Sequence, residues 1–403
     1  MASLMRTIKD QIPQSIKRRY HDRRREYRLS EQGSLDQIRA VVRDMKTRNV
    51  EDCFRDEIAN PVADLRQAPV QVSAIEINDS CNLNCAMCET KKAERGKKGL
   101  MNIELFRVGV EKLCARGMRA TNLHTLGDPI ANRNLRDYLE ILRDNNVYLT
   151  NFSTNGLMLK RHMDTLFEFR ENIGTMRFSI DAATKPTYER IRVGGEFETL
   201  HENLLAFTER NSLAPHPFTV HVSAVVSADN YHELAMIPHV FSYLAPATSF
   251  SFGMLATQEP THGYFDKFNL FGDQFQVRQP CNRNWRSLFV LKNGDMTTCC
   301  QDYHGDIVFG NLFEDDVDQA YNNDFMQGVR RAHLENDIAA MPKICQGCYV
   351  VDLRLDDVFN GIFQYFFRNV QKHPAYLQQA LNEIRPRLSV MDMDGVMEIV
   401  EEL

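Results

Sequence analysis

From residue 72 onward, short apolar or alternating runs take turns with longer segments of helical periodicity. The runs that predict strands are VSAIEI (72–77), ATNLHT (120–125), VYLTNFS (147–153), TMRFSI (175–180), FTVHVSAVV (218–226) and TSFSFGM (248–254). The segments that predict helices are 102–117, 132–145, 159–171, 197–210 and 230–243. Strands that alternate with helices of this length form βα units with parallel strands and right-handed crossovers. The pattern therefore predicts an α/β fold with a partial (βα)6 TIM-like barrel over residues 71–260.

The segments on either side of this pattern have a different character. Residues 1–70 are polar and predict a helical extension without strands. Residues 1–28 hold nine Lys/Arg against three acids, so this basic arm could contact a membrane surface, a nucleic acid or an acidic protein, or be a solvated arm. Residues 353–403 also predict helix, and their aromatic run FNGIFQYFFRNV favours a core-facing or lid helix.

Composition is that of an ordinary globular protein, with 43% apolar and 25% charged residues. The net charge of −6 argues against a general nucleic-acid binder, and by itself it suits a cationic or neutral substrate. No apolar stretch is long enough to span a bilayer, and the basic start lacks the apolar segment and cleavage site of a secretory signal. We therefore expect a cytoplasmic protein with no membrane span and no nucleic-acid partner.

The ten cysteines change this picture, because thiols in a cytoplasmic protein are more often metal ligands or catalytic groups than disulfides. Cys53 and Cys114 stand apart, and Cys114 falls on the apolar face of a predicted helix, which indicates a core position. The other eight form two groups, one of Cys81, Cys85 and Cys88 and one of Cys281, Cys299, Cys300, Cys345 and Cys348.

The first cysteine group directly follows the first predicted strand, and polar loops follow the next three. These loops are LGDP with Gly127 and Asp128, STNG with Ser153 and Asn155, and SIDA with Ser179 and Asp181. Such residues also simply punctuate loops. In parallel barrels, however, the carboxyl ends of the strands meet at one mouth, where the chemistry takes place. Four successive strand ends therefore predict one functional site.

The spacing C-x3-C-x2-C leaves two kinds of metal site to consider. A structural zinc site wants four protein ligands, and the nearest further ligand to the three cysteines is His124 on the next strand. Three thiolates that hold a four-iron cluster would instead leave one iron open. The amino and carboxylate groups of S-adenosylmethionine (SAM) can chelate an open iron, which lets SAM receive an electron and be cleaved to a carbon radical.

These motifs, in this order, resemble those of the radical SAM superfamily over residues 70–260. The resemblance implies that Cys81, Cys85 and Cys88 hold a [4Fe-4S] cluster to which SAM binds. LGDP stands where the family has a Gly-Gly-Glu-Pro-like motif for the methionine amino group, with Leu126 in place of the first Gly and Asp128 in place of the Glu. The further SAM-binding residues that it implies are Gly127, Ser153, Asn155, Ser179, Asp181, Arg192 of IRVGG for the SAM carboxylate, and Met87 for the adenine.

The second cysteine group resembles the SPASM or twitch extension of this superfamily, here placed at residues 275–352. Twelve residues separate Cys281 from Gly294, four separate Gly294 from Cys299, and Cys345-x2-Cys348 follows. These spacings alone would equally suit zinc. The resemblance implies one auxiliary [4Fe-4S] cluster, held by Cys281, Cys299, Cys345 and Cys348, because no further cysteine follows Cys348.

Cys300 and Asp302 are the catalytic candidates beside this second group. Cys300 could donate a hydrogen atom or accept a proton, but it could also be the ligand in place of Cys299 or a buried bystander. Asp302 competes with it as a general base. His124 and Tyr303 are further acid–base candidates, and the sequence gives no order among them.

The resemblance implies an oxidoreductase or epimerase that abstracts hydrogen from its substrate through a 5′-deoxyadenosyl radical, with an external electron donor such as flavodoxin or ferredoxin. The absence of strands in residues 1–70 and the short extension favour a small polar substrate of the sugar, aminocyclitol or nucleotide-sugar type. The alternative is a maturase that modifies a peptide or protein through a crosslink or residue oxidation. A metal-stabilised scaffold without catalytic activity is the hypothesis from another class.

Overall fold

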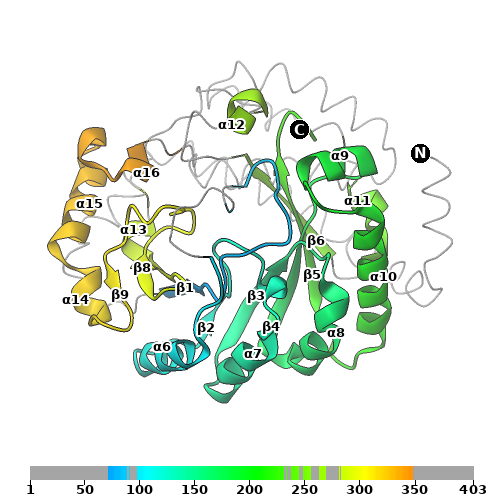
Figure 1. Cartoon of the computed structure of the whole chain (residues 1–403), viewed down its shortest axis with the longest axis horizontal. Helices are drawn as coiled ribbons and strands as arrows, with labels where there is room; N and C mark the ends of the chain where they lie inside the picture. Colours follow the sequence, from blue (N-terminus) through cyan, green and yellow to red (C-terminus); the bar gives the residue numbers. More distant parts are fainter. Residues whose placement is uncertain are drawn as a thin grey trace, which may run out of the picture.

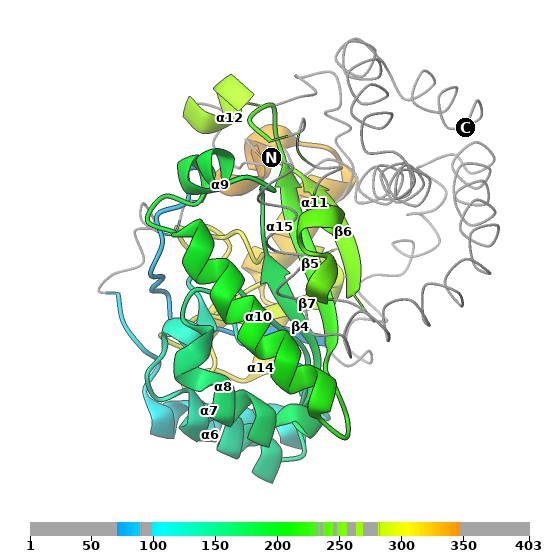
Figure 2. The same ribbon diagram turned by 90° about the vertical axis from the view of Figure 1, so that its right-hand side faces the viewer.

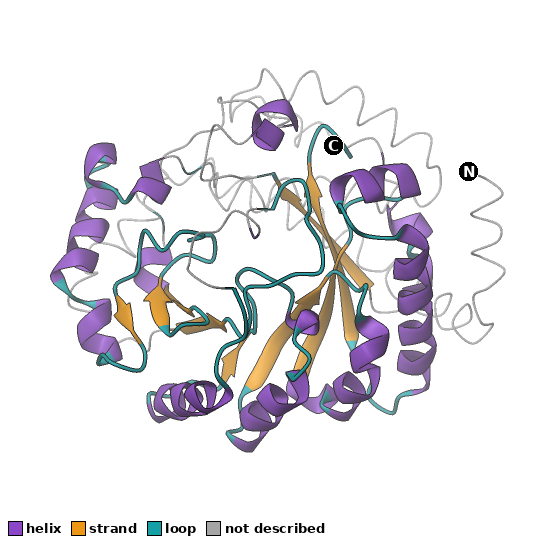
Figure 3. Ribbon diagram, viewed as in Figure 1, coloured by secondary structure: helices purple, strands orange, loops and turns teal. Residues whose placement is uncertain are grey.

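The fold has two sheets, and the first strand of the smaller sheet lies beside the start of the larger one, as a computed structural model shows (Figures 1 and 3). The structure describes residues 71–88, 90, 98–230, 233, 237–244, 248–255, 263–268, 281, 283–346 and 348. The extension predicted over 1–70, which includes Cys53, and the helical segment predicted over 353–403 lie outside the described residues.

The larger sheet is parallel throughout and follows the order β2-β3-β4-β5-β6. Its strands are β2 (Ala120–Thr121), β3 (Tyr148–Thr154), β4 (Ile173–Ser179), β5 (Thr219–Val226) and β6 (Thr248–Met254). The helices along this part of the chain are α6 (Ile103–Ala115), α7 (Leu135–Asp144), α8 (Leu159–Glu168), α9 (Lys185–Ile191), α10 (Phe197–Leu213), α11 (Ile237–Val240) and α12 (Gly263–Phe268). Short 3-10 helices lie at Pro129–Ala131, Arg170–Asn172 and Ser242–Leu244. The predicted α/β class with a parallel, barrel-like sheet is confirmed.

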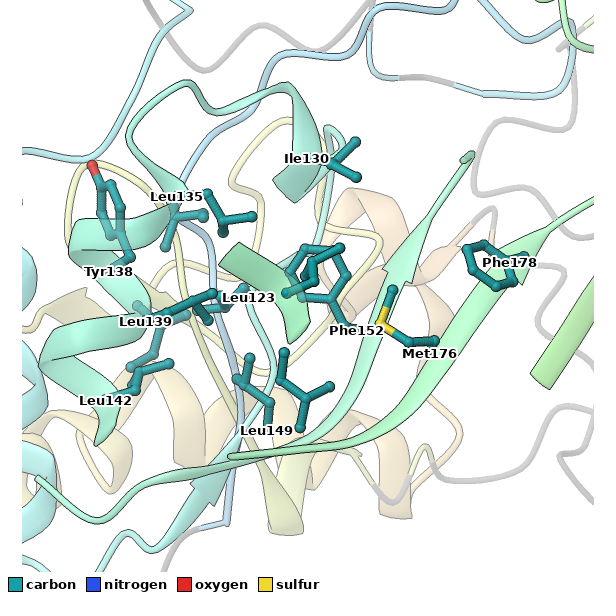
Figure 4. Close-up of a cluster of buried hydrophobic side chains, with 14 of the residues drawn as sticks. Leu123, Ile130, Leu135, Tyr138, Leu139, Leu142, Leu149, Phe152, Met176 and Phe178 are labelled. Carbon is teal, nitrogen blue, oxygen red and sulfur yellow. The ribbon is translucent and has the colours of Figure 1, made fainter. Parts of the chain in front are cut away.

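Helices α7, α8 and α10 cover one side of this sheet (Figures 1 and 2). Figure 4 shows how strands and helices turn apolar side chains toward one another, with Leu149 and Phe152 of β3 between α7, which carries Leu139 and Leu142, and Met176 of β4. Further along the sheet, the ring of Phe178 meets the ring of Phe207 on α10 edge to face, with their centroids 5.4 Å apart. Burial of this face is the main force that holds the helices on the sheet.

Two elements differ from the sequence prediction in length. β2 is two residues long, although a strand was predicted over 120–125, because side-chain bonds of Asn122 replace part of the ladder. Its amide nitrogen donates to the carbonyl of Ser73 at 2.9 Å, and its amide oxygen accepts from the N–H of Asn151 at 3.0 Å. The helix predicted over 230–243 is described only as α11 and a short 3-10 turn.

The smaller sheet follows the order β1-β7-β8-β9. Its strands are β1 (Gln71–Ile75), β7 (Ser287–Val290), β8 (Asp295–Thr297) and β9 (Gly310–Asn311), and its helices are α13 (Arg283–Arg286), α14 (Val317–Tyr321), α15 (Asp324–Leu334) and α16 (Lys343–Gln346), with a 3-10 turn at Ile338–Ala340. β1 pairs in parallel with β7. On its other edge, the N–H of Ile75 donates to the carbonyl of Asn122 at 2.9 Å. β1 therefore joins the two halves of the molecule.

Buried charges reinforce this junction. Glu76, directly after β1, is fully buried and accepts hydrogen bonds from the N–H of Leu126 at 3.0 Å and the N–H of Lys292 at 3.2 Å. The ammonium group of Lys292 lies 3.5 Å from the carboxylate of Asp79, which is also buried. One carboxylate thus bonds to backbone groups from both halves. The domain boundaries predicted at residues 260 and 275 stay predictions.

Helix α6 packs against the smaller half. It begins after Asn102, whose side-chain oxygen accepts from the first N–H groups of the helix. Lys112 on this helix donates to the carbonyls of Leu312 and Asp315 at 2.8 and 2.6 Å. Gly109 allows the close approach, since a Cβ there would lie 2.9 Å from Leu312. Among the described helices, none combines the length and the apolar character that a membrane crossing requires.

Candidate active site

The loop of the first three cysteines is held by the segment that contains IRVGG. The N–H of Asn84 donates to the carbonyl of Val193 at 2.9 Å, and the N–H of Ala86 donates to the carbonyl of Ile191 at 2.8 Å. Met87 lies in the turn before the third cysteine and is half-buried. Two motifs that are far apart in the chain therefore form one backbone unit.

Two of the thiols in this loop, those of Cys81 and Cys88, have hydrogen-bond donors around them. The sulfur of Cys81 accepts from the N–H of Leu83 at 3.4 Å and from the side-chain amide of Asn155 at 3.6 Å. The sulfur of Cys88 lies 3.0 Å from the hydroxyl of Thr90 and 3.5 Å from its N–H. Burial, with a contribution from the charge of Asp128, raises the pKa of Cys81 to about 11. Donors to sulfur are one means by which a protein tunes a bound cluster.

A buried ion pair stands beside Cys85. The guanidinium of Arg192 lies 2.5 Å from the carboxylate of Asp181, and its Nη1 donates to the sulfur of Cys85 at 3.6 Å. Burial raises the pKa of Cys85, and the charge of Arg192 opposes that rise. Burial also lowers the pKa of Arg192, but the charges of Asp181 and Cys85 outweigh this effect and the net shift is upward. Arg192 is thus charged and faces the cysteine loop, and one side of its guanidinium is paired with the carboxylate of Asp181.

The LGDP and STNG loops are joined to each other by Asp128. This buried carboxylate accepts from the hydroxyl of Thr154 at 3.0 Å, from the N–H of Asn155 at 2.8 Å and from the N–H of Ile130 at 3.0 Å. Burial raises the pKa of Asp128, and these hydrogen bonds oppose the rise. Asn155 in turn reaches Cys81, so the ends of β1, β2 and β3 meet at one place.

The remaining predicted SAM-binding residues take less direct positions. Ser153 is buried and donates to the side chain of Asn151 at 3.0 Å. Ser179 is half-buried at the end of β4, where it pairs in register with Ser223. Gly127 has φ 65° and lies against the turn before the cysteine loop, where a Cβ would come within 2.7 Å of the carbonyl oxygens of Asn78 and Ser80. SAM binding by each of these residues stays a prediction.

Substitution of Gly127 by alanine is expected to destabilise the protein and to lower the iron content after reconstitution. The left-handed conformation alone costs about 1–2 kcal/mol for a residue with a Cβ, and the contacts with Asn78 and Ser80 add to that cost. Denaturant unfolding and iron analysis measure both effects. Gly117→Ala is the matched control, because Gly117 has φ 99° but nothing within 4 Å of its Cβ position. Equal losses of stability and iron in the two variants would show that the contacts with Asn78 and Ser80 add nothing to the cost of a Cβ at Gly127.

The second cysteine group also gathers in space. Burial raises the pKa of Cys345, and the charges of Cys281 and Cys348 add to the rise. Burial raises the pKa of Cys299 strongly, with further contributions from Cys300 and Cys281. The guanidinium of Arg283 provides the opposing positive charge. The five cysteines that the sequence grouped together are Cys281, Cys299, Cys300, Cys345 and Cys348.

The two catalytic candidates, Cys300 and Asp302, differ in the number of hydrogen bonds that they make within the protein. The thiol of Cys300 is half-buried and lies 3.3 Å from Nη1 of Arg283, which is 3.9 Å from Cys299. The buried carboxylate of Asp302 accepts from the hydroxyl of Thr297 at 2.9 Å and from the N–H groups of residues 306 and 307 at 2.7 and 3.0 Å. The structure thus gives Asp302 a role within its own loop, while catalysis by either residue stays a prediction.

The donor sets fit iron–sulfur clusters. All of these cysteines are free thiols. Within the described residues, no group of three His, Cys, Asp or Glu side chains converges closely enough to hold a single metal ion. Thiolates on loops with nearby N–H donors suit an iron–sulfur cluster.

Two family models match the two halves of the chain in order. The model described as "Radical SAM superfamily" matches residues 75–237, and the model described as "Iron-sulfur cluster-binding domain", named SPASM, matches residues 281–349. The chain belongs to the radical SAM superfamily. The cofactors of this radical SAM protein are therefore SAM and a [4Fe-4S] cluster, with auxiliary iron–sulfur in the SPASM half.

Individual relatives are distant. A GTP 3′,8-cyclase of Synechocystis sp. is 26% identical over 131 residues, which is 32% of this chain and 39% of the cyclase, so this chain spans about two fifths of that relative's length. The solved structure of Streptococcus suis SuiB bound to the precursor peptide SuiA has a TM-score of 0.53 and 13% identity, covering 68% of this chain and 71% of SuiB. The similarity to SuiB shows the fold alone.

The sheet face opposite the helices carries a row of polar side chains, and of these only Ser153 and Ser179 belong to the motifs of this radical SAM protein. In this row, Arg177 of β4 lies in register with Ser153 of β3 and His221 of β5. The two ring nitrogens of His221 lie 2.7 Å from the hydroxyl of Ser249 and 2.6 Å from that of Ser251 on β6. The alternation TVHVS at the start of TVHVSAVV was the available signal, since parallel strands buried on both faces read as continuous apolar runs.

Proposed function

We propose that this radical SAM protein abstracts hydrogen from a small polar substrate of the sugar, aminocyclitol or nucleotide-sugar type, and that oxidation or epimerisation follows. The observation that carries this proposal is the polar face of β4, β5 and β6. The interior of a closed barrel is usually a packed core of branched apolar side chains. Here, half-buried His221 and Ser223 of β5 occupy that face beside Ser251 of β6, and such groups can bind the hydroxyls of a sugar.

In this proposal Arg192, Asp128 and Asn155 have separate roles around the cysteine loop. When bound, the reduced cluster and SAM supply a 5′-deoxyadenosyl radical that removes a hydrogen atom from the substrate. The charge of Arg192 stabilises negative groups beside the cysteine loop. Asp128 and Asn155 hold the loops at the strand ends in one geometry, which a radical reaction needs for its target carbon. An external electron donor such as flavodoxin or ferredoxin and a cytoplasmic location belong to the same proposal.

The experiment is anaerobic reconstitution followed by incubation with SAM, dithionite and a panel of neutral sugars, sugar phosphates, nucleotide-linked sugars, aminocyclitols and peptides. Formation of 5′-deoxyadenosine is measured by mass spectrometry, and deuterium transfer from a deuterated substrate identifies the attacked position. We expect a small polar compound to stimulate the product and to pass deuterium to it. Stimulation and transfer by peptides alone would replace this proposal with peptide modification. A protein with intact clusters that never cleaves SAM would be a scaffold.

A further inference from the structure

Arg177 is a cation without an anion on the polar face of the sheet. It lies in the middle of β4 and is half-buried. Burial lowers its pKa, with no opposing contribution from a carboxylate. Among the described residues it has neither an ion pair nor a hydrogen-bond acceptor, whereas Arg192 in the same half of the molecule is paired with Asp181. A partly desolvated charge is unfavourable unless something compensates for it.

The side chains around Arg177 are neutral hydrogen-bonding groups. His221 lies beside it in register, and burial together with the charge of Arg177 lowers the pKa of His221 to about 4. The same two effects lower the pKa of His124 to about 4, and Nδ1 of His124 is buried with no hydrogen-bond partner among the described residues. The other side chains of the row are Thr175, Ser223, Ser249 and Ser251, besides the predicted SAM-binding residues Ser153 and Ser179. Among these described groups there is one positive charge and no carboxylate.

This combination points to one class of ligand. A guanidinium presents a planar fork that matches the oxygens of phosphate and carboxylate groups, and such charge-assisted bonds are stronger than neutral ones. A phosphate has three oxygens, so it can also use hydroxyl and imidazole donors of the kind that surround Arg177. A cationic group would meet unfavourable repulsion here. The positive charge of this sheet face therefore favours an anionic ligand, whereas the net charge of −6 for the whole chain suggests a cationic or neutral one.

We propose that Arg177 binds a phosphate group of the substrate, with hydrogen bonds from the serines and histidines of the same sheet face. This inference rests on the proposed function and narrows it to phosphorylated or nucleotide-linked sugars, which excludes aminocyclitols. Arg177 is a binding residue in this proposal and takes no part in the transfer of hydrogen.

The test uses inorganic pyrophosphate as the probe and the full-length, reconstituted protein with SAM, in anaerobic calorimetric titrations. We expect Arg177→Gln to weaken pyrophosphate binding by about tenfold to a hundredfold, because a charge-assisted hydrogen bond is lost. The affinity of Arg177→Lys for pyrophosphate should lie between that of the unchanged protein and that of Arg177→Gln, since lysine keeps the charge but lacks the planar pair of N–H donors. Arg161→Gln is the matched control, because Arg161 is exposed on α8 and should leave the affinity unchanged.

Iron content and the thermal midpoint identify variants that fail to fold, and Arg177→Lys then carries the test. Unchanged affinity in the folded Arg177 variant would overturn the inference, as would equal losses in the Arg161 variant. The two proposals fail differently. Stimulation of 5′-deoxyadenosine formation by neutral sugars or aminocyclitols, without binding of pyrophosphate, removes only the phosphate site. Pyrophosphate binding that depends on Arg177, together with stimulation by peptides alone, removes only the small-molecule function.

Discussion

Cys85→Ala is expected to abolish the formation of 5′-deoxyadenosine from SAM. Cys85 is the middle member of the loop triad and the one whose sulfur faces the Arg192 guanidinium at 3.6 Å. Without its thiolate the cluster would have two protein ligands, and iron would be lost on purification. Because even changes outside the ligand shell of a metal site cost ten- to a hundredfold, we expect a loss of more than about a hundredfold. Mass spectrometry of the nucleoside product, with iron analysis, measures it.

Cys114→Ala is the control for this experiment. Cys114 belongs to α6, is partly buried against the core and stands apart from both cysteine groups, so its removal should leave the iron content and SAM cleavage intact. Magnetic resonance spectra of the reduced protein, recorded with and without SAM, provide an independent measure. If Cys85→Ala retained a cluster whose spectrum still responded to SAM, the assignment of the triad would be wrong.

Asp181→Asn is expected to lower the free energy of unfolding by about 3–5 kcal/mol, because it leaves the buried Arg192 guanidinium without its counter-charge. The carboxylate of Asp181 also accepts from the N–H of Val225 at 2.7 Å, so the change loosens β5 as well. Urea unfolding of the reconstituted protein measures the difference. The cluster should also become more labile, since Arg192 contacts the cysteine loop through Cys85.

The control for this second prediction is an ion pair on the surface. Glu202→Gln removes the partner of Lys160, and both side chains are more than half exposed, at 68% and 58%, so the cost should stay below about 1 kcal/mol. The double variant Asp181→Asn, Arg192→Gln should recover part of the loss, because no unpaired charge remains. A loss no larger than that of Glu202→Gln would mean that water or another group already compensates Arg192.

The sequence was most informative where short motifs bring fixed chemistry. The cysteine spacing and the loops after the strands predicted that Cys81, Asn155 and Arg192 would serve one site, and the structure brings them together. The motifs did not show how each carboxylate is used. Asp128 and Asp302 both accept several backbone N–H groups, which depends on the exact path of their loops.

Other features lacked a local signal or had one that is easily overlooked. Arg177 lies in no motif, and its position on the polar face follows only from the alternation along β4 and β5. The pairing of β1 with β7 joins segments that lie far apart in the chain, and parallel pairing between such distant segments leaves no trace in local periodicity. Tertiary packing decides such contacts, so they become visible only in the structure.

The position of β1 limits how this enzyme could be taken apart. Residues 281–348 look like an exchangeable module in the sequence, yet the sheet within them takes its first strand from the other half. Grafted onto a different barrel, they would carry β7 with an open row of backbone donors and acceptors, which invites pairing between chains. Recombination, in nature or in the laboratory, would have to transfer β1 along with them, and the crossover point would then fall inside the radical-generating half.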